Sequence, residues 1–406
     1  MPQPLAGIRV LEFGNFIAGP LCGMLLADMG AEVIKVEPVR SGDMSRATPP
    51  FVGGESSGFL ALNRNKKSIA LDLRQPQAVD VVRKLAAETH VFLENYRPGV
   101  LARMGLGAQQ MKALNPTIAY VSVSGFGQTG PYRERSAVNL IIEAFSGSLS
   151  ITGEPGEAPM RPGLQTGDVL GAMFAVYATL CALLGRFRHG HGRIVDLSLV
   201  EASISSAIWE VAEYLSTGNV PLPLGRRHRL TAPYQLFQAT DGAYLAIGTP
   251  NNELFTRLMK VLGCEAAVAD PRFATYALRK ENEAAIVALV EGAVHERESH
   301  ELERALMAVG VPCARVNNYA EVLNDEHIVA RALVAEVEHP TAGKLRVLRN
   351  PVRFDQDGPA VARPAPLLGE HTAEVLHGLG YASETIKSLE ASGIIQCAPV
   401  TARKEH

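Results

Sequence analysis

One acidic residue stands directly before a long apolar run. Asp168 precedes residues 169–184, in which only Tyr177 and Thr179 carry hydroxyl groups. Aspartate is a favoured helix N-cap because its carboxylate accepts the free N–H groups of the first turn and the helix dipole stabilises its charge. The pattern predicts a helix capped by Asp168. Its carboxylate would be oriented and poorly hydrated, which suits a nucleophile, although a purely structural cap explains the same residues.

The helix after Asp168 is apolar on every side, which predicts a central buried element rather than a surface one. A membrane span is the alternative, but the run of 16 residues falls short of the roughly 20 that a span needs. The approach 163–168, GLQTGD, carries two glycines, which let another molecule come close to the backbone. We expect a core helix with an accessible first turn.

Basic residues gather upstream of this helix. Arg64, Lys66, Lys67 and Arg74 surround a predicted strand at 68–73, and Arg97 and Arg103 follow in a later turn. Lysine and arginine are the usual partners of phosphate groups, so the cluster indicates a phosphate site. A solvated sheet edge is the alternative.

The elements that must position these residues alternate between strand and helix. Strands are expected at 7–13, 31–37 and 91–95, with a glycine-rich turn and helix at 14–30 and an amphipathic helix at 76–90. Such alternation predicts an open α/β sheet with parallel strands, in which ligands bind beyond the carboxyl ends of the strands. The loop after the first strand lacks GxGxxG, so a dinucleotide fingerprint is missing.

The character of the chain changes after residue 217. Residues 218–235 are proline-rich and basic, and Asp241-Gly242 between two apolar runs predicts a hairpin. Helices are expected from 252 to about 309, followed by β-rich structure from 339. These features predict a second, smaller domain.

Composition and missing motifs exclude several classes of protein. The 406 residues carry a net charge of −3 with both signs interspersed, which argues against nucleic-acid binding. Five scattered cysteines without CxxC spacing argue against disulfides and zinc, and suit a cytoplasmic protein. Neither a signal peptide nor a membrane anchor is expected, and GxSxG, a P-loop and a metal-ligand set are not found.

Eight stretches of the sequence carry a family resemblance. From about residue 4 to residue 390 they run in the order LAGIRVLEF, AGPLCGMLLADMGAEVIKVE, SGDMSR, NRNKKSIALDL, ENYRPGVLARMGL, SGFGQTGPYRERSAVN, GDVLGA and PAPLLGEHTAEVL. Together they resemble the class III CoA-transferases, the family of formyl-CoA transferase, carnitine CoA-transferase and α-methylacyl-CoA racemase. No single stretch is specific, but eight in family order are.

The resemblance implies an architecture. It implies an open Rossmann-like α/β large domain at 1–217, a linker and smaller α+β domain at 218–330, and a segment at 331–406 that returns to the large domain. It also implies an interlocked homodimer. Coenzyme A and its thioesters are implied as substrates together with a small carboxylic acid, with no permanently bound cofactor.

The resemblance also implies site residues. Asp168 falls on the family's catalytic aspartate. The positions that fall around CoA are Phe16, Leu71, Arg74, Asn95, Tyr96, Arg97, Arg103, Met104, Ala137, Val138 and Leu199. The implied mechanism passes through a mixed anhydride and a β-aspartyl-CoA thioester on Asp168. Covalent catalysis of this kind splits one difficult exchange into activated steps.

Two alternatives remain beside transfer. A racemase needs a second proton-transfer group, and the matching position here is Val138, with no histidine between His90 and His189. Inversion of configuration at a carbon requires two bases on opposite faces, and one of them is missing here. Racemisation is therefore disfavoured. A CoA-binding protein without turnover is the other alternative, and the retained context of Asp168 argues against it.

The acceptor acid is expected to be a dicarboxylate. Residues 221–234 lack the tetraglycine lid of formyl-CoA transferase, and several stretches look more like the glutarate CoA-transferase branch. Arg226, Arg227 and His228 form a basic cluster that would pair with a distal carboxylate, with a solvated linker as the alternative. Succinyl-CoA is the expected donor.

Overall fold

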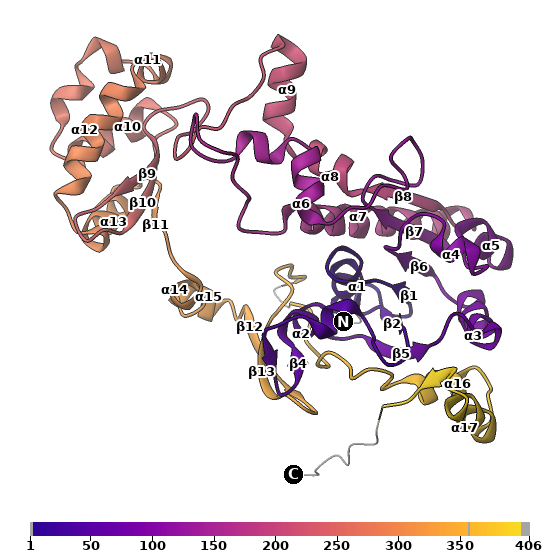
Figure 1. Ribbon diagram of the computed structural model, residues 1–406. Coiled ribbons are helices and arrows are strands. Elements are labelled where there is room, and N and C mark those ends of the chain that lie inside the picture. The colour runs from indigo at the N-terminus through magenta and orange to yellow at the C-terminus, as the bar shows by residue number, and fades with distance from the viewer. Residues whose placement is uncertain (1–2, 356–357, 399–406) are drawn as a thin grey trace. The chain divides into compact units, whose positions relative to one another are not determined.

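The computed structural model describes residues 3–355 and 358–398 (Figure 1). The chain forms two compact units. The larger contains residues 1–148, 162–219 and 329–406, and the smaller contains 149–161 and 220–328. The expected boundaries at 217/218 and 330/331 lie close to these. The difference is Leu149–Arg161, which was expected in the large domain but clusters with the smaller unit.

A seven-stranded sheet forms the centre of the larger unit. Its strand order is β14-β5-β2-β1-β6-β7-β8. All neighbours pair in parallel except β14, which pairs antiparallel to β5 at one edge. The strands are β1 (Arg9–Phe13), β2 (Glu32–Glu37), β5 (Lys67–Leu71), β6 (Val91–Glu94), β7 (Ala119–Ser124), β8 (Ile194–Ser198) and β14 (Ile395–Gln396). The expected α/β class with a largely parallel sheet is confirmed.

Helices cover both faces of this sheet. Because side chains alternate along a strand, Leu11 and Phe13 of β1 join one buried cluster while Val10 joins another. On the first face the rings of Phe13, Phe92 and Tyr120 stack in sequence, with centroids 4.8 and 4.7 Å apart. The helices on this face are α3 (Pro76–Ala87), α5 (Ala108–Leu114), α16 (Thr372–Gly378) and α17 (Ser383–Ala391).

The opposite face holds the helices that matter for Asp168. They are α1 (Ala18–Asp28), α6 (Asn139–Phe145), α7 (Thr166–His189) and α8 (Leu199–Ser206). Helix α7 packs on α1, α6, α8 and β7, and its buried residues are mostly small. Glycine and alanine on that side let the neighbouring helices approach closely.

Helix α7 is not buried all round, contrary to the expectation. Large apolar side chains stand exposed along one side, at Val169, Met173, Tyr177, Leu180, Leu184 and Phe187. Their spacing of three and four residues makes one stripe along the helix, called here the α7 stripe. The helix is long and apolar enough to cross a membrane by length and composition, with a mean hydropathy of 1.8. Its small-residue side lies in the core of the larger unit, as expected of a core helix.

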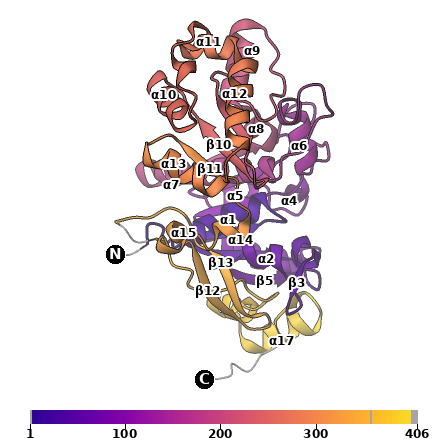
Figure 2. The same cartoon turned by 90° about the vertical axis from the view of Figure 1, so that its left-hand side faces the viewer.

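The remaining elements of the larger unit are short. They include α2 (Ser57–Leu62), α4 (Val100–Arg103), α9 (Ile208–Thr217), the hairpin β3 (Phe51–Val52) and β4 (Glu55–Ser56), and the hairpin β12 (Val334–His339) and β13 (Gly343–Leu348). The β12–β13 hairpin lies beside α2 in both views (Figures 1 and 2), where Leu345 packs against Phe59 and Leu60. A 3-10 turn covers Met44–Ala47.

The smaller unit is α+β. Its antiparallel sheet consists of β9 (Tyr234–Gln238), β10 (Tyr244–Gly248) and β11 (Cys313–Arg315). The expected hairpin is present, with Gly242 in the left-handed region at φ 80°. The helices are α10 (Asn252–Val261), α11 (Tyr276–Glu281), α12 (Glu283–His295), α13 (Ser299–Ala308) and α14 (Tyr319–Val322). Helix α15 (Glu326–Ala330) spans the boundary between the two units.

Candidate active site

Asp168 lies in the first turn of α7, but not at the predicted cap position. The helix begins at Thr166, so Gln165 occupies the N-cap. Glu143 explains the earlier start, because its Oε1 accepts hydrogen bonds from both the backbone N and the Oγ1 of Thr166, at 3.0 and 2.7 Å. The orphan donors of the first turn are partly satisfied from α6. The carboxylate of Asp168 is therefore not needed as a cap.

Helix α6 packs against the first turn of α7, which contains Asp168. The Asp168 backbone N donates to Oδ1 of Asn139 over 3.1 Å. Gly167 makes this approach possible: a Cβ there would lie 2.9 Å from Cγ2 of Ile142 and 3.1 Å from Oδ1 of Asn139. The glycine of the GLQTGD approach thus serves close packing of two helices.

Burial, together with the nearby charge of Glu143, raises the pKa of Asp168 to about 6. The group is still mostly ionised at neutral pH. A carboxylate that is ionised but poorly hydrated has lost part of the solvation that makes carboxylates weak nucleophiles. The first turn of α7 is therefore suited to nucleophilic chemistry.

A pocket of about 400 Å³ opens at the carboxyl ends of β2, β5 and β6. Four of the residues expected around CoA line it, namely Leu71, Arg74, Tyr96 and Met104. Leu71 is buried, and the Arg74 side chain is 82% exposed at the pocket with its Nε 2.7 Å from Oδ1 of Asp72. An apolar wall beside an exposed guanidinium suits an aromatic ring that carries phosphate.

The other expected CoA residues have varied settings. Asn95 joins two loops, because its side chain accepts from the N of Asn15 and donates to the O of Asn15. Phe16 is 44% exposed and has a φ of 59°, rare for a residue with a Cβ. Leu199 packs into the space left by Gly171 on α7. The exposed residues in this group are Arg97, Arg103 and Val138, and Ala137 is half-buried.

The expected phosphate cluster is largely wrong. Arg64 is buried with its Nη2 2.6 Å from Oδ2 of Asp28. Lys66 is buried against Glu12, and Lys67 is tied to Glu32 and Glu374. A cation whose donors are already held by carboxylates has little left for a phosphate. Arg74 also donates to Asp72, through Nε and Nη2, but its side chain is exposed, and it alone of these four residues lines the pocket described above.

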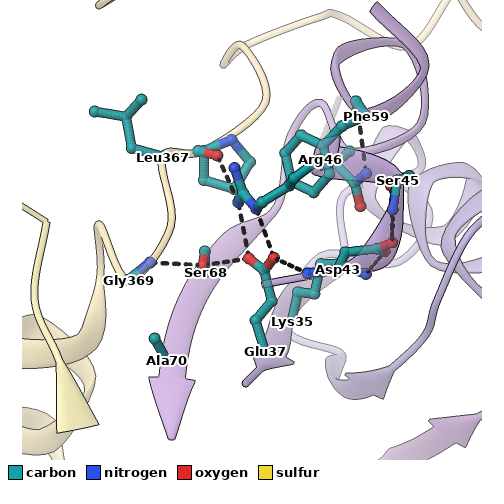
Figure 3. A network of polar contacts seen from close by, with 12 residues as sticks. Lys35, Glu37, Asp43, Ser45, Arg46, Phe59, Ser68, Ala70, Leu367 and Gly369 are labelled. Atoms are coloured by element: carbon teal, nitrogen blue, oxygen red, sulfur yellow. Dashed lines mark hydrogen bonds and ion pairs between the residues drawn. The ribbon is translucent and has the colours of Figure 1, made fainter. Parts of the chain in front are cut away.

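Sequence reasoning missed a buried charge network around Lys35, Glu37 and Asp43 (Figure 3). This network also holds the loop of Phe16. Lys35 Nζ lies 2.8 Å from Oδ2 of Asp43, and Asp43 Oδ1 accepts from the N of Phe16 at 3.1 Å. Glu37 accepts from Arg46, at 2.7 and 2.8 Å. The acidic residues lie in the motifs VEPVR and SGDMSR. The alternation of acidic and basic residues there was the only signal in the sequence for this network.

The same network ties the C-terminal segment to the sheet. Ser68 Oγ donates to Glu37 Oε1 at 2.6 Å and accepts from the N of Gly369 at 3.0 Å (Figure 3). Arg46 also donates to the O of Pro366. The segment after residue 331 therefore contacts the start of β5 and helps to order the loop that follows β2.

The residues expected to bind the distal carboxylate of the acceptor acid belong to the smaller unit. The ring of His228 stacks on Tyr234 with centroids 4.4 Å apart, and burial lowers the pKa of His228. Arg227 lies 3.7 Å from Glu283, and the guanidinium of Arg226 lies 5.9 Å from the ring centre of Tyr244. The cluster is thus partly engaged within its own unit.

Comparison with known families decides the assignment. The model of CoA-transferase family III matches residues 5–372. The chain belongs to CoA-transferase family III. The expected resemblance, and with it the expected class of enzyme, is confirmed.

Relatives of this family III CoA-transferase cover nearly the whole chain. The succinyl-CoA:glutarate CoA-transferase of Mus musculus is 37% identical over 97% of this chain and 91% of its own. The succinyl-CoA–D-citramalate CoA-transferase of Chloroflexus aurantiacus is also 37% identical, over 97% and 98%. A crystal structure of a CAIB/BAIF family protein from Brucella suis matches with a TM-score of 0.83 and 34% identity, covering 93% of this chain and 100% of that one.

Proposed function

We propose that this family III CoA-transferase moves CoA from succinyl-CoA to a dicarboxylic acid such as glutarate, with Asp168 as the nucleophile. The observation that carries the proposal is a carboxylate of raised pKa in the first turn of a core helix. The pocket lined by Arg74 and Tyr96, at the carboxyl ends of β2, β5 and β6, is the proposed place for the nucleotide end of CoA. The names of the two relatives described above give succinyl-CoA as the donor and a dicarboxylate, glutarate or citramalate, as the acceptor. This supports the proposed donor and the proposed class of acceptor.

The exchange follows from the chemistry of one carboxylate. An Asp168 oxygen attacks the thioester carbon of succinyl-CoA, the C–S bond breaks, and a mixed anhydride and CoA thiolate form. The thiolate attacks the Asp168 carboxyl carbon and the C–O bond to succinate breaks, which leaves a β-aspartyl-CoA thioester. The acceptor carboxylate then reverses both steps. Anchoring of CoA by its nucleotide end keeps the thiolate beside the anhydride, which raises its effective concentration.

The acceptor's distal carboxylate needs a cationic partner. We propose the basic residues Arg226, Arg227 and His228 for this role, supported by their charge and by the dicarboxylate acceptors of the relatives. In an Arg226→Gln variant, the ratio of kcat/KM for glutarate to that for a monocarboxylic acid of equal length should fall about tenfold. An unchanged ratio would remove Arg226 from the acceptor site.

Two copies of the chain are proposed to associate through the α7 stripe, as an interlocked homodimer. The support is an exposed apolar stripe on a helix whose other side is already packed. Contiguous exposed apolar surface of this kind is typical of protein–protein interfaces. The cytoplasm is the proposed location, on the grounds of five free cysteines among the described residues.

Mass spectrometry of the purified protein tests the function. Wild type is mixed with succinyl-CoA and a panel of mono- and dicarboxylic acids, beside Asp168→Ala. New acyl-CoA species with wild type alone, and a hydroxylamine-sensitive adduct on Asp168, are expected. Equal rates with monocarboxylic and dicarboxylic acceptors would contradict the proposed substrate class. Deuterium incorporation beside the thioester without exchange would favour a racemase, and CoA binding alone would favour a binding protein.

A further inference from the structure

Asn139 presents a buried amide group beside Asp168 that the proposed mechanism has not used. The residue is 8% exposed, and its Oδ1 is fixed by the hydrogen bond from the N of Asp168. The Nδ2 atom is fully buried and donates to no group within residues 3–355 and 358–398. A buried donor left without an acceptor destabilises the fold, because it has lost its hydrogen bonds to water. Such a donor is expected where a ligand or reacting group supplies the acceptor.

Covalent geometry keeps this donor at the first turn of α7, the turn that carries the Asp168 carboxyl group. Both heteroatoms of the Asn139 amide share one carbon, so fixing Oδ1 at the N of Asp168 also fixes Nδ2. Only Cα and Cβ separate that nitrogen of Asp168 from its carboxyl carbon. Gly167 permits the approach, since a Cβ there would lie 3.1 Å from Oδ1 of Asn139. The amide therefore cannot drift away from the first turn of α7.

We propose that Asn139 is a further catalytic residue, whose Nδ2 donates a hydrogen bond to the oxyanion formed on the Asp168 carboxyl carbon. The inference rests on the proposed function. When the CoA thiolate attacks the anhydride, the new C–S bond places a negative charge on the carbonyl oxygen, and that charge collapses as the C–O bond to the leaving carboxylate breaks. A fixed donor in a water-poor site stabilises this charge without reorganising.

The charges around the amide explain why a neutral donor is suited to this place. Glu143 lies on the same helix as Asn139 and raises the pKa of Asp168 by repulsion. A lysine or arginine at position 139 would pair with these carboxylates and weaken the nucleophile. An amide stabilises the developing oxyanion and leaves the ground-state carboxylate unneutralised. This difference between transition state and ground state is what accelerates a reaction.

Two variants separate donation from anchoring. Asn139→Asp keeps an acceptor for the N of Asp168 but loses the Nδ2 donor. Asn139→Leu loses both the acceptor and the donor, with a side chain of nearly the same size. If Nδ2 donates to the oxyanion, both variants should lower kcat by about 10²–10³-fold with KM for succinyl-CoA within about threefold. The aspartate's extra charge should move the acidic limb of the pH profile upward, so kcat is compared on the plateau of each variant.

A matched control uses the same substitution at another helix start. Asn251 caps α10 in the smaller unit, where its Oδ1 accepts from the N of Leu254 at 2.9 Å. Asn251→Asp should leave kcat and KM unchanged. Thermal unfolding and CoA titration confirm that each variant is folded, and if Asn139→Leu is not, Asn139→Asp alone decides.

The outcomes distinguish this inference from the proposed function. A plateau kcat of Asn139→Asp within about threefold of wild type, with only Asn139→Leu impaired, would make Asn139 an anchor and overturn the donor role. Loss of plateau kcat in both variants supports it. Wild type that exchanges no acyl group with any acid would overturn the proposed function, and this inference with it.

Discussion

At the scale of single residues, the site depends on how each charge is used. Asp168 keeps an ionised but poorly hydrated carboxylate because α6, not its own side chain, supplies acceptors to the first turn of α7. Arg74 lines the pocket at the strand ends, whereas Arg64 and Lys66 form ion pairs with buried carboxylates. The charge of a residue did not predict whether it lines the pocket or forms a buried ion pair.

The pKa of Asp168 predicts the pH dependence of exchange. Because the carboxylate form attacks, kcat/KM should rise with pH through about 6 and then level off. Glu143→Gln keeps an acceptor for Thr166 but removes the repelling charge, so the rise should move to lower pH. The measurement is a pH–rate profile of both proteins. Superimposable profiles would show that Glu143 does not influence the nucleophile.

The same shift predicts an effect on stability. A carboxyl group whose pKa is higher in the folded than in the unfolded state stabilises the fold at low pH, and this contribution is lost as pH rises through the window from about 4 to about 6. Above that window Asp168→Asn should therefore raise the free energy of unfolding, by about 1–2 kcal/mol after allowing for partial exposure. Denaturant titrations at pH 7.5 and pH 4 should show the gain only at the higher pH.

Arg74 is expected to contribute binding rather than rate. Arg74→Ala should raise KM for succinyl-CoA about three- to tenfold with little change in kcat, since an exposed cation contacts the nucleotide end equally in ground and transition states. Arg83→Ala, on the outer side of α3, serves as the matched loss of charge. If both variants behave alike, the effect is one of net charge and Arg74 does not contact CoA.

At the scale of elements, the decisive contact is between α6 and α7. Gly167 leaves space for Ile142 and Asn139 of α6, so these two helices can approach closely, and Gly171 leaves space for Leu199 of α8. This places Asn139 and Glu143 beneath a turn that lies more than 20 residues further along the chain. Small residues on one side of α7 therefore serve the geometry of the site as well as the core.

Gly167→Ala tests this contact. The added Cβ would lie 2.9 Å from Ile142 Cγ2, so the first turn of α7 must shift. We expect at least a tenfold loss of kcat and a loss of about 1 kcal/mol of stability, despite alanine's better helix propensity. Gly185→Ala in the same helix, where nothing lies within 4 Å, should instead be neutral or stabilising by up to about 1 kcal/mol. Equal behaviour of the two variants would contradict the role of the close approach.

At the scale of the whole molecule, the α7 stripe sets the expected oligomeric state. Met173 and Tyr177 are 53% and 65% exposed in the larger unit, although α7 is its longest helix. An apolar side that is left in water lowers solubility, and covering it by a second copy removes this cost.

Replacing the stripe should change assembly. Tyr177→Asp combined with Met173→Asp should shift the protein from dimer to monomer in light scattering after size exclusion, because two charges would have to be buried at the interface. Met307→Asp, at a similarly exposed methionine on α13, is the control and should leave the mass unchanged. A monomeric wild type, or a variant that stays dimeric, would remove the α7 stripe from the interface.

Local sequence patterns were sufficient to predict the fold class, the order of the strands along the chain and the family. Apolar runs of strand length between helical segments predict a parallel sheet, and turn glycines such as Gly242 mark a hairpin. The motif GDVLGA, whose residues are contiguous in the sequence, is what makes Asp168 the predicted nucleophile. Arg74 directly follows one such family motif and Tyr96 lies in another, so both could be proposed as CoA contacts from the sequence.

Which side chains remain available for chemistry depends on contacts between segments that are distant in the sequence. The partners of Lys66 and Arg64 stand at Glu12 and Asp28, dozens of residues away, and only packing brings them together. Asn139 and Glu143 likewise reach Asp168 through the packing of α6 on α7, and the exposed side of α7 follows from where its neighbours stop. Local patterns carry no record of such contacts, because the free energy of a buried charge depends on what surrounds it in space.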